Sequence, residues 1–315
     1  MSRNGKTEYD DNFKHLAEQK IEKSGYSFLN GYYYYLLTNM AYTSAWNYTY
    51  KVIRFLDEEL IEDPSEIKLD HYVKHLAGLK DSSSSNRITS YAAMKKFSKY
   101  LYAKGICKDD YMRFVERPKA VETQEQIDKR MKGVLTKNEC RNAIDKAKND
   151  QAEPWMKARD SAILSVFIST GIRRAAMYKL DVNDFDFNNN TISVIEKGSI
   201  YRKVYCPYSV MKAVKEWFNY RDQMVDKSET AAFISERKRR ISAVALSNVV
   251  TKYTGKTPHK LRATCVTELY NKTGDIYFVQ KTIGHASPQT TEVYIRGKEK
   301  ENAKKMARIM NDFLE

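Results

Sequence analysis

The sequence predicts a mainly α-helical protein of two domains with one small β-hairpin or sheet. A chain of 315 residues has room for two domains that each bury a core. Most of its apolar residues recur at helical spacing, and only residues 188–207 alternate apolar and polar side chains around a Gly-Ser turn. Residues 116–133 lack a sustained apolar face and contain Pro118, so we interpret them as an interdomain linker.

A small all-helical domain is expected over residues 27–115, after an N-terminal extension of residues 1–26. Residues 27–60 run without a proline, and their second half has apolar residues at helical spacing. The serine run within residues 81–87 leads directly into another segment with apolar residues at helical spacing, which extends through Tyr102. Since serine is a favoured N-cap residue, we interpret this run as a helix start rather than a low-complexity linker.

A larger second domain is expected over residues 134–315. Thr136 followed by Glu139 has the spacing of a capping box. An apolar helix is predicted over residues 160–174 with its end at Gly171, and the hairpin of residues 188–207 follows. Further helices are predicted near residues 208–224, 244–252, 258–272, 275–283 and 288–295, with a C-terminal tail helix at 299–313.

The charge of the chain is strongly positive and unevenly distributed. The net charge is +14, of which residues 1–117 carry +2 and residues 118–315 carry +12. Such an excess favours a polyanionic partner, most simply nucleic acid, although a basic solubilising surface is an alternative. Hydrophobic content of 42% and charged content of 30% are typical of a soluble globular protein.

Several classes of protein are disfavoured by the sequence. No apolar run reaches the length of a membrane span, and the polar N-terminus gives no secretory signal, so we expect a cytoplasmic protein with no membrane partner. No HExxH motif is present, and no cluster of metal-ligating residues stands out, so no metal is expected. The four cysteines are far apart and are interpreted as reduced thiols: Cys107, Cys140, Cys206 and Cys265.

Two cationic residues of the second domain stand at turns. Arg173 follows the helix-ending Gly171 in ISTGIRRAAM, and Lys197 precedes Gly198 in the turn of the predicted hairpin. Taken singly, a lysine in a turn and an arginine after a helix are most often solvated residues. Neither residue identifies a function alone.

The segment TPHKLRATCV has the features of an anion-binding helix start. Thr257 is a plausible N-cap and Pro258 a first-turn proline. His259 and Arg262 stand three residues apart on the first turn, where helix amides also point outward. The alternative is that His259 packs and Arg262 pairs with a surface acid.

The segment TIGHASPQTTEVYIRG places His285 nine residues before Tyr294. Ser287 and Pro288 suit the start of a short helix that carries Tyr294. Together with the segments above, the chain offers two arginines, a lysine, two histidines and a tyrosine. Cationic forks suit the oxygens of a phosphodiester in its pentavalent transition state, and a tyrosine phenolate could form a resealable phosphotyrosyl link without a metal ion.

The order Arg173, Lys197, His259, Arg262, His285, Tyr294 resembles the signature of the tyrosine recombinase family, which includes lambda-integrase-like and Xer-like enzymes. The settings TGIR, PHKLR and IGHASPQTTEVY also match, and the resemblance covers most of residues 134–297. It is weaker over residues 27–115, which look like the family's helical, SAM-like core-binding domain. Two positions depart from the pattern, because a commonly acidic residue is Ala176 and an often-found histidine is Ala263.

The resemblance implies a role for each of the six residues. Tyr294 would attack the scissile phosphate to leave a 3′-phosphotyrosyl bond and a free 5′-hydroxyl. Arg173 and Arg262 would hold the phosphate oxygens, and Lys197 would protonate the leaving oxygen. His259 would assist proton transfer from the tyrosine, and His285 would hydrogen-bond the phosphate. The family needs no metal, nucleotide or other cofactor.

The resemblance also implies partners. Two domains would form a C-shaped clamp on double-stranded DNA carrying an inverted-repeat core site, and a homotetramer would join two duplexes through tail helix 299–313. An accessory DNA-bending or directionality protein is possible, and a bacterial, phage or mobile-element origin is expected. Five residues of the serine-led helix could contact the major groove: Ser85, Arg87, Lys95, Lys96 and Lys99.

Several functions remain open from the sequence. Integration or excision of a mobile element is favoured, with Xer-like resolution of chromosome or plasmid dimers as the alternative. A type IB topoisomerase and a non-catalytic DNA-binding regulator are further alternatives. The DNA target and the choice between cis and trans cleavage do not follow from the residues.

Overall fold

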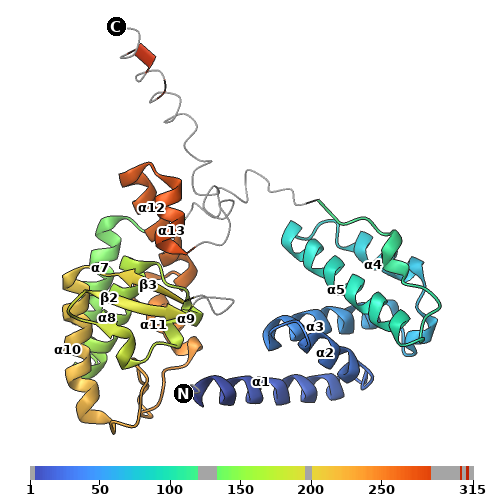
Figure 1. Ribbon diagram of the computed structural model, residues 1–315, viewed down its shortest axis with the longest axis horizontal. Helices are drawn as coiled ribbons and strands as arrows, with labels where there is room; N and C mark the ends of the chain where they lie inside the picture. Colours follow the sequence, from blue (N-terminus) through green and yellow to red (C-terminus); the bar gives the residue numbers. More distant parts are fainter. Residues whose placement is uncertain (1–3, 120–132, 196–200, 285–305, 307–309, 312–315) are drawn as a thin grey trace. The chain divides into compact units, whose positions relative to one another are not determined.

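The computed structural model describes residues 4–119, 133–195 and 201–284, together with positions 306, 310 and 311. The chain divides into two compact units, Met1–Glu122 and Thr123–Glu315. Residues 120–132 of the predicted linker lie outside the described residues. The fold is mainly helical with one small antiparallel sheet, as the sequence predicts (Figure 1). In the described ranges, no helix combines the length and the apolar character needed to cross a membrane.

The first unit is a set of helices around an aromatic core. Its α-helices are α1 (Asn4–Lys23), α2 (Leu29–Leu37), α3 (Tyr42–Glu59), α4 (Leu69–Gly78) and α5 (Ser84–Ala103), with short 3-10 turns at Pro64–Glu66 and Tyr111–Phe114. Phe55 of α3 stacks on Tyr72 of α4 with ring centroids 5.0 Å apart. Tyr32 of α2 meets Phe97 of α5 edge-on at 5.1 Å, and all four rings are buried. These ring contacts stabilise the packing of α3 against α4 and of α2 against α5.

The start of this unit differs from the expectation. Residues 1–26, predicted as an extension, contain α1, and Ala17 and Ile21 of that helix are buried in the core of the first unit. The first compact unit therefore begins before residue 27. The serine run behaves as predicted, since the hydroxyl of Ser83 accepts from the backbone N–H of Asn86 at the start of α5.

The second unit is organised around helix α8. Over residues 133–284 its described α-helices are α7 (Lys137–Lys148), α8 (Pro154–Thr170), α9 (Arg174–Tyr178), α10 (Tyr208–Met224), α11 (Ala243–Thr254), α12 (Pro258–Thr273) and α13 (Ile276–Ile283). Every residue from 158 to 167 in α8 is buried, and α7, α10, α11 and α12 all pack against it (Figure 1). A helix surrounded in this way buries apolar residues on every side, and the charged side chains of Arg159 and Asp160 within it are paired with each other. It begins at Pro154 rather than residue 160, with Glu153 as N-cap and the proline in its first turn.

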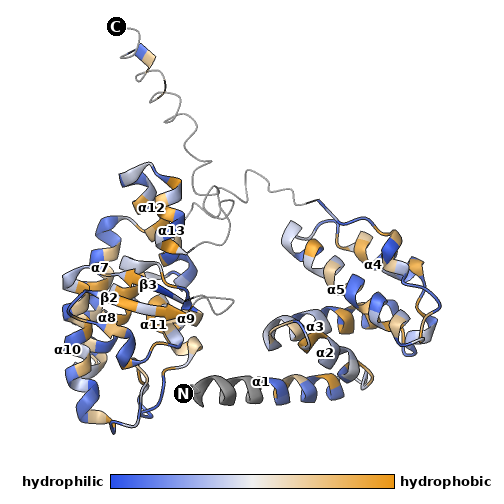
Figure 2. Ribbon diagram, in the orientation of Figure 1, coloured by the Kyte–Doolittle hydropathy of each residue, from blue (hydrophilic) through white to orange (hydrophobic). Residues whose placement is uncertain are grey.

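A three-stranded antiparallel sheet lies beside these helices, with the strands in the order β1 (Phe185–Asp186), β2 (Thr191–Ile195) and β3 (Tyr201–Tyr205). The predicted hairpin is confirmed, since Thr191 pairs with Tyr205 and Ile195 with Tyr201. Strand β1 has only two residues, too few to show an alternating pattern. Hydrophobic residues dominate β2 in Figure 2, where Ile192 and Val194 are buried.

Helix caps predicted from the sequence fix several boundaries. The N–H of Glu139 donates to the Thr136 hydroxyl at 3.2 Å, and the N–H of Thr136 donates to the Glu139 carboxylate at 2.7 Å. This is the predicted capping box of α7. The predicted helices 288–295 and 299–313 lie outside the described residues, apart from positions 306, 310 and 311.

Candidate active site

The turn after α8 positions Arg173. Helix α8 ends at Gly171, whose φ of 57° is left-handed, and Arg173 is the N-cap of the next helix, α9. A Cβ on Gly171 would lie 3.0 Å from Cδ1 of Ile283 and 3.2 Å from Cβ of Cys265. Glycine therefore serves both the backbone conformation and the close approach of α12 and α13.

Arg262 is the buried centre of the site. Its side chain, only 5% exposed, donates from Nη1 to the Gly171 carbonyl at 2.6 Å and from Nη2 to the Ile283 carbonyl at 3.0 Å. One guanidinium thus joins the ends of α8 and α13 to the first turn of α12. Backbone carbonyls, rather than a surface acid, accept these hydrogen bonds, which the sequence left open.

His259 lies one turn before Arg262 but is exposed. The predicted helix start is confirmed in position, with Thr257 as N-cap and Pro258 in the first turn. The hydroxyl of Thr257 makes no capping hydrogen bond, however. The predicted N-cap position and helix start are nevertheless confirmed.

The end of α13 collects three arginines from three elements. Helix α13 ends at Gly284, whose φ is 70°. Its last carbonyls accept hydrogen bonds from Arg202 (to Thr282, 2.6 Å), Arg262 (to Ile283, 3.0 Å) and Arg173 (to Gly284, 3.3 Å). The final carbonyls of a helix have no partners within the helix and carry the negative end of its dipole, so they attract cations. We call Arg173, Arg202 and Arg262 the arginine cluster.

Arg202 was not predicted from the sequence. It lies on β3, where Arg202 and Val204 share the inward face while Tyr201, Lys203 and Tyr205 are exposed. An arginine at an inward position of an alternating strand is unusual, because a buried charge needs a partner. That position was the signal in the sequence that could have identified it.

Three predicted residues, Lys197, His285 and Tyr294, lie outside the described residues. The structure therefore brings together Arg173 and Arg262 and places His259 on the helix of Arg262. By sequence, His285 follows directly after Gly284, and Lys197 stands between β2 and β3. The two departures from the family pattern, Ala176 and Ala263, are both buried among apolar residues.

Cys265 lies next to the arginine cluster but is not a competing nucleophile. Burial raises the pKa of its thiol to about 12, although the charges of Arg262 and Arg202 act in the opposite direction. The thiol donates to the Ser169 carbonyl at a sulfur–oxygen distance of 3.7 Å. At neutral pH it stays protonated, and only a thiolate is strongly nucleophilic.

The candidate DNA contacts on α5 do not all share one side of the helix. At about 100° per residue, Lys96 and Lys99 lie within about 40° of Ser85 around the axis, and Lys95 within about 80°. Arg87 lies about 160° away from Ser85 on the same count. Ser85, Lys95 and Lys99 are exposed, and the ammonium of Lys95 lies 5.8 Å from the ring centroid of Tyr91.

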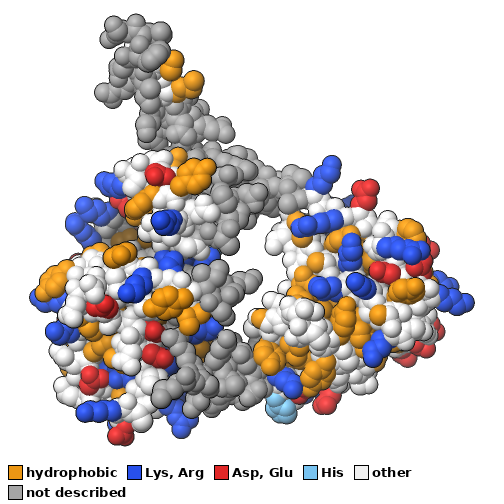
Figure 3. All heavy atoms as spheres, viewed as in Figure 1, with side chains coloured by type: hydrophobic (Ala, Val, Ile, Leu, Met, Phe, Trp, Pro, Cys, Tyr) orange, Lys and Arg blue, Asp and Glu red, His pale blue; other side chains and the backbone are white. Residues whose placement is uncertain are grey.

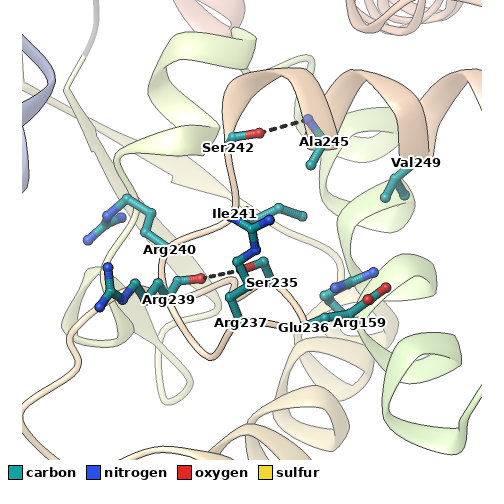
Figure 4. A pocket seen from close by; sticks show the side chains of 10 residues that line it. All are labelled: Arg159, Ser235, Glu236, Arg237, Arg239, Arg240, Ile241, Ser242, Ala245 and Val249. Atoms are coloured by element: carbon teal, nitrogen blue, oxygen red, sulfur yellow. Dashed lines mark hydrogen bonds between the residues drawn. The ribbon is translucent and has the colours of Figure 1, made fainter. Parts of the chain in front are cut away.

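A cavity of about 690 Å³ lies elsewhere in the second unit, around the start of α11 (Figure 4). Its lining includes Arg159, Arg237, Arg239 and Arg240, but none of the predicted catalytic residues that the structure describes. Arg159 is paired with Asp160 and Arg240 with Asp181. In the described ranges, no group of three or more His, Cys, Asp or Glu side chains could hold a metal ion.

Fold and site together define a protein of the tyrosine recombinase class. Residues 133–301 match the family described as "Phage integrase family", and the chain belongs to this family. The class inferred from the sequence is thereby confirmed.

Relatives of the chain agree with this assignment. The chain is 31% identical over 209 residues to a protein named tyrosine recombinase XerC from Corynebacterium glutamicum, covering 64% of this chain and 65% of that protein. It is 29% identical to tyrosine recombinase XerC from Shewanella amazonensis, covering 70% of this chain and 72% of that protein.

Two solved structures share the fold. One is XerH site-specific recombinase bound to a palindromic difH substrate, with a TM-score of 0.64 and 18% identity, covering 86% of this chain and 80% of that chain. The other is a lambda integrase dimer bound to a COC′ core site, with a TM-score of 0.61 and 16% identity, covering 85% and 94%.

Replacing Arg262 by alanine should lower the free energy of unfolding of the second unit by about 2–4 kcal/mol, because two buried carbonyls lose their donor. Arg174→Ala is the matched control: Arg174 is exposed and donates to the Ser247 hydroxyl, so its loss should change stability by less than about 0.5 kcal/mol. Urea unfolding followed by tryptophan fluorescence in a Trp46→Phe background reports on Trp155 and Trp217. Equal stability of the two variants would contradict the structural role of Arg262.

Proposed function

We propose that the chain is a site-specific tyrosine recombinase that cleaves and rejoins double-stranded DNA through Tyr294. One observation carries the proposal: Arg173 and Arg262, 89 residues apart in the sequence, meet at the end of α13, directly before His285. The two arginines that the family pattern selects by their order in the sequence are therefore also close together in the structure. The alternative readings of these arginines as separate solvated residues do not explain this convergence.

The chemistry follows from the roles that the family pattern assigns. The Tyr294 oxygen attacks the scissile phosphorus, its proton leaves with assistance from His259, and the bond from phosphorus to the 5′-oxygen breaks. Lys197 gives a proton to the departing 5′-oxygen. The phosphotyrosyl bond conserves the energy of the broken ester, so a 5′-hydroxyl can reverse the step and reseal a strand without ATP.

Arg173 and Arg262 supply the electrostatic part of this reaction. A guanidinium keeps its charge and presents five N–H donors in a plane, so it can hold backbone carbonyls along one edge and phosphate oxygens along another. Because Arg262 is anchored by two carbonyls, its position is set before DNA arrives. Prearranged cations at a pentavalent phosphorus need no reorganisation during the reaction.

DNA contact is proposed for both units. Lysine and arginine side chains occur on both units in the face shown in Figure 3. In the first unit, we assign the phosphate contacts to the side of α5 that carries Ser85, Lys96 and Lys99. Arg87, on another side of this helix, is assigned no part in that contact.

Two biological roles are consistent with a tyrosine recombinase of this kind. Integration or excision of a mobile element is the role we favour, and resolution of chromosome or plasmid dimers is the second candidate. The similarity to XerC relatives, which are 31% and 29% identical to this chain, supports the dimer-resolution role. Sequencing the DNA on either side of the gene decides between them, because an adjacent attachment site is expected only for a mobile element.

We also propose that four copies assemble on two duplexes through the tail, with each tail helix bound by a neighbouring copy. The support is an apolar pair on the tail: Met306 and Met310 stand four residues apart and are 67% and 43% exposed. Exposed apolar residues at this spacing on a helix form a surface that burial against a partner would stabilise.

Catalysis can be tested by covalent trapping. Nicked duplexes carrying sites that the Tyr294→Phe protein selects from a randomised library should become covalently joined to the native protein, but not to Tyr294→Phe. The product is measured by denaturing gel electrophoresis and peptide mapping. Failure of the native protein to form any covalent product would sink the catalytic proposal in favour of a DNA-binding regulator, and relaxation of arbitrary supercoiled plasmid would favour a topoisomerase.

The α5 assignment predicts a change in salt dependence. Lys96→Ala/Lys99→Ala should reduce the slope of log K against log salt by about 1.8, because each lost phosphate contact contributes about 0.9. Arg87→Ala, which removes a cation from another side of the same helix, should leave the slope within about 0.5. Fluorescence anisotropy with a selected duplex measures both, and an equal effect of the two variants would remove the assignment.

The tail assignment predicts a loss of assembly. Met306→Glu/Met310→Glu should reduce the complex on DNA to dimers or single copies, because the two charged side chains cannot be buried against a partner. Truncation after Gly297 should have the same effect, because it removes both methionines. Asn311→Glu places a charge at a neighbouring exposed position and should leave tetramers intact. Mass photometry on DNA distinguishes these states, and tetramers that survive truncation would refute the proposal.

A further inference from the structure

The guanidinium of Arg202 occupies the space directly beside Gly284. Its Nη1 donates to the Thr282 carbonyl at 2.6 Å. A Cβ built on Gly284 would lie 2.7 Å from Nε, 3.2 Å from Cζ and 3.3 Å from Cδ of Arg202. The arginine and the glycine therefore fit against each other, and a larger residue at position 284 would push the guanidinium away from the carbonyl it holds.

The sheet fixes where this guanidinium stands. Arg202 pairs with Val194 in the antiparallel register of β2 and β3, and its neighbour on the same face, Val204, is 4% exposed. Since the pairing register determines which side chains face inward, Arg202 has no freedom to turn to solvent without moving the strand. The contact with Thr282 thus ties strand β3 to helix α13 across 80 residues of sequence.

These two elements border two of the proposed catalytic residues in the sequence. Strand β3 begins four residues after Lys197, and α13 together with Gly284 ends directly before His285. The other two members of the arginine cluster, Arg173 and Arg262, bind the same carbonyl end of α13. Arg202 therefore links the strand that follows Lys197 to the helix end that Arg173 and Arg262 also bind.

We propose that Arg202 is a positioning residue of the active site. It fixes the last turn of α13 against β3, and so sets where the chain leaves Gly284 relative to Arg173 and Arg262. Position 284 is glycine because the Arg202 side chain fills the space that a Cβ would need. This inference rests on the proposed recombinase function and adds a residue to its site.

Lysine cannot replace this arginine fully. A guanidinium is planar and offers donors along a rigid fork, so it can lie flat beside Gly284 while it reaches the Thr282 carbonyl. A lysine ammonium is a compact charge on a flexible chain and can reach the carbonyl without filling the space next to the glycine. Arg202→Lys should accordingly restore part of what Arg202→Ala loses.

The first experiment needs no DNA. Hydrogen exchange by mass spectrometry on the full chain should show faster exchange of the amides in the last turn of α13 in Arg202→Ala, with an intermediate effect in Arg202→Lys. Lys203→Ala removes a neighbouring β3 cation on the opposite, exposed face and should leave this exchange unchanged. Unchanged exchange in Arg202→Ala overturns the proposal, whatever the protein does with DNA.

The second experiment measures single-turnover formation of the phosphotyrosyl product at saturating nicked duplex, together with the affinity for the same duplex. A catalytic group displaced by about 1 Å can cost about 100-fold in rate, so Arg202→Ala should slow cleavage 10- to 100-fold with less than a 3-fold change in Kd. A matching loss of affinity, or a cleavage rate like that of Lys203→Ala, overturns the positioning role.

A double-mutant comparison tests the link between the arginine and the glycine. Gly284→Ala should slow cleavage strongly in the native background, since the new Cβ displaces Arg202 and the residue retains an unfavourable positive φ. In the Arg202→Ala background, Gly284→Ala should slow cleavage by a factor several-fold smaller than in the native background, because the new Cβ no longer meets the Arg202 side chain. Independent, multiplicative effects overturn the proposed fit. If the native protein forms no covalent product, the recombinase proposal fails while the exchange experiment still decides the contact.

Discussion

The second unit depends on one buried charge, the guanidinium of Arg262. Placing a cation in a protein interior costs free energy unless hydrogen-bond acceptors replace water. Here the carbonyls of Gly171 and Ile283 provide that replacement. These carbonyls belong to helix ends, where acceptors are unsatisfied and the dipole is negative, so the cation and the two helices satisfy each other. The same contact that stabilises α8, α12 and α13 therefore holds the proposed phosphate clamp in place.

Pairing of arginine with backbone carbonyls recurs in this unit. Arg221 donates to the Ala231 carbonyl at 2.7 Å, Arg159 to the Ile234 carbonyl at 3.2 Å, and Arg240 to the Leu180 carbonyl at 2.9 Å. Arg221 and Arg159 are buried. Part of the +12 charge of residues 118–315 is thus committed to holding loops and strands together. The net charge of a domain therefore overstates the number of cations available to DNA. The structure is needed to tell which arginines bind backbone carbonyls and which can contact DNA.

Local signals in the sequence were sufficient for much of the fold. The capping box of Thr136 and Glu139, the helix-ending Gly171 and the hairpin of β2 and β3 depend on residues close together in the sequence, and each was predicted correctly. Helix α1 was not predicted, although Phe13, Leu16, Ala17 and Ile21 stand at helical spacing. That Ala17 and Ile21 are buried depends on packing against other helices, which local spacing does not give.

The candidate site shows the same division between local and long-range information. Arg173 and Arg262 were identified by their motifs, but their acceptors could not be, since Gly171, Ile283 and Gly284 become neighbours only through the fold. Arg202 belongs to none of the motifs described above. Its inward position on an alternating strand can be read from the sequence, but its contact with the end of α13 appears only in the fold.

The geometry also explains why two of the motifs contain glycine. Gly171 and Gly284 both end a helix in the left-handed conformation, and both turn a carbonyl toward an arginine of the cluster: Gly171 toward Arg262 and Gly284 toward Arg173. At each position a Cβ would meet a side chain of the site, Ile283 in the first case and Arg202 in the second. The glycines of TGIR and IGH are therefore the points at which two helix ends approach the arginines closely enough to hold them. Among the described motif residues, Arg173 and Arg262 bind the helix ends, and Gly171 and Gly284 make room for that contact.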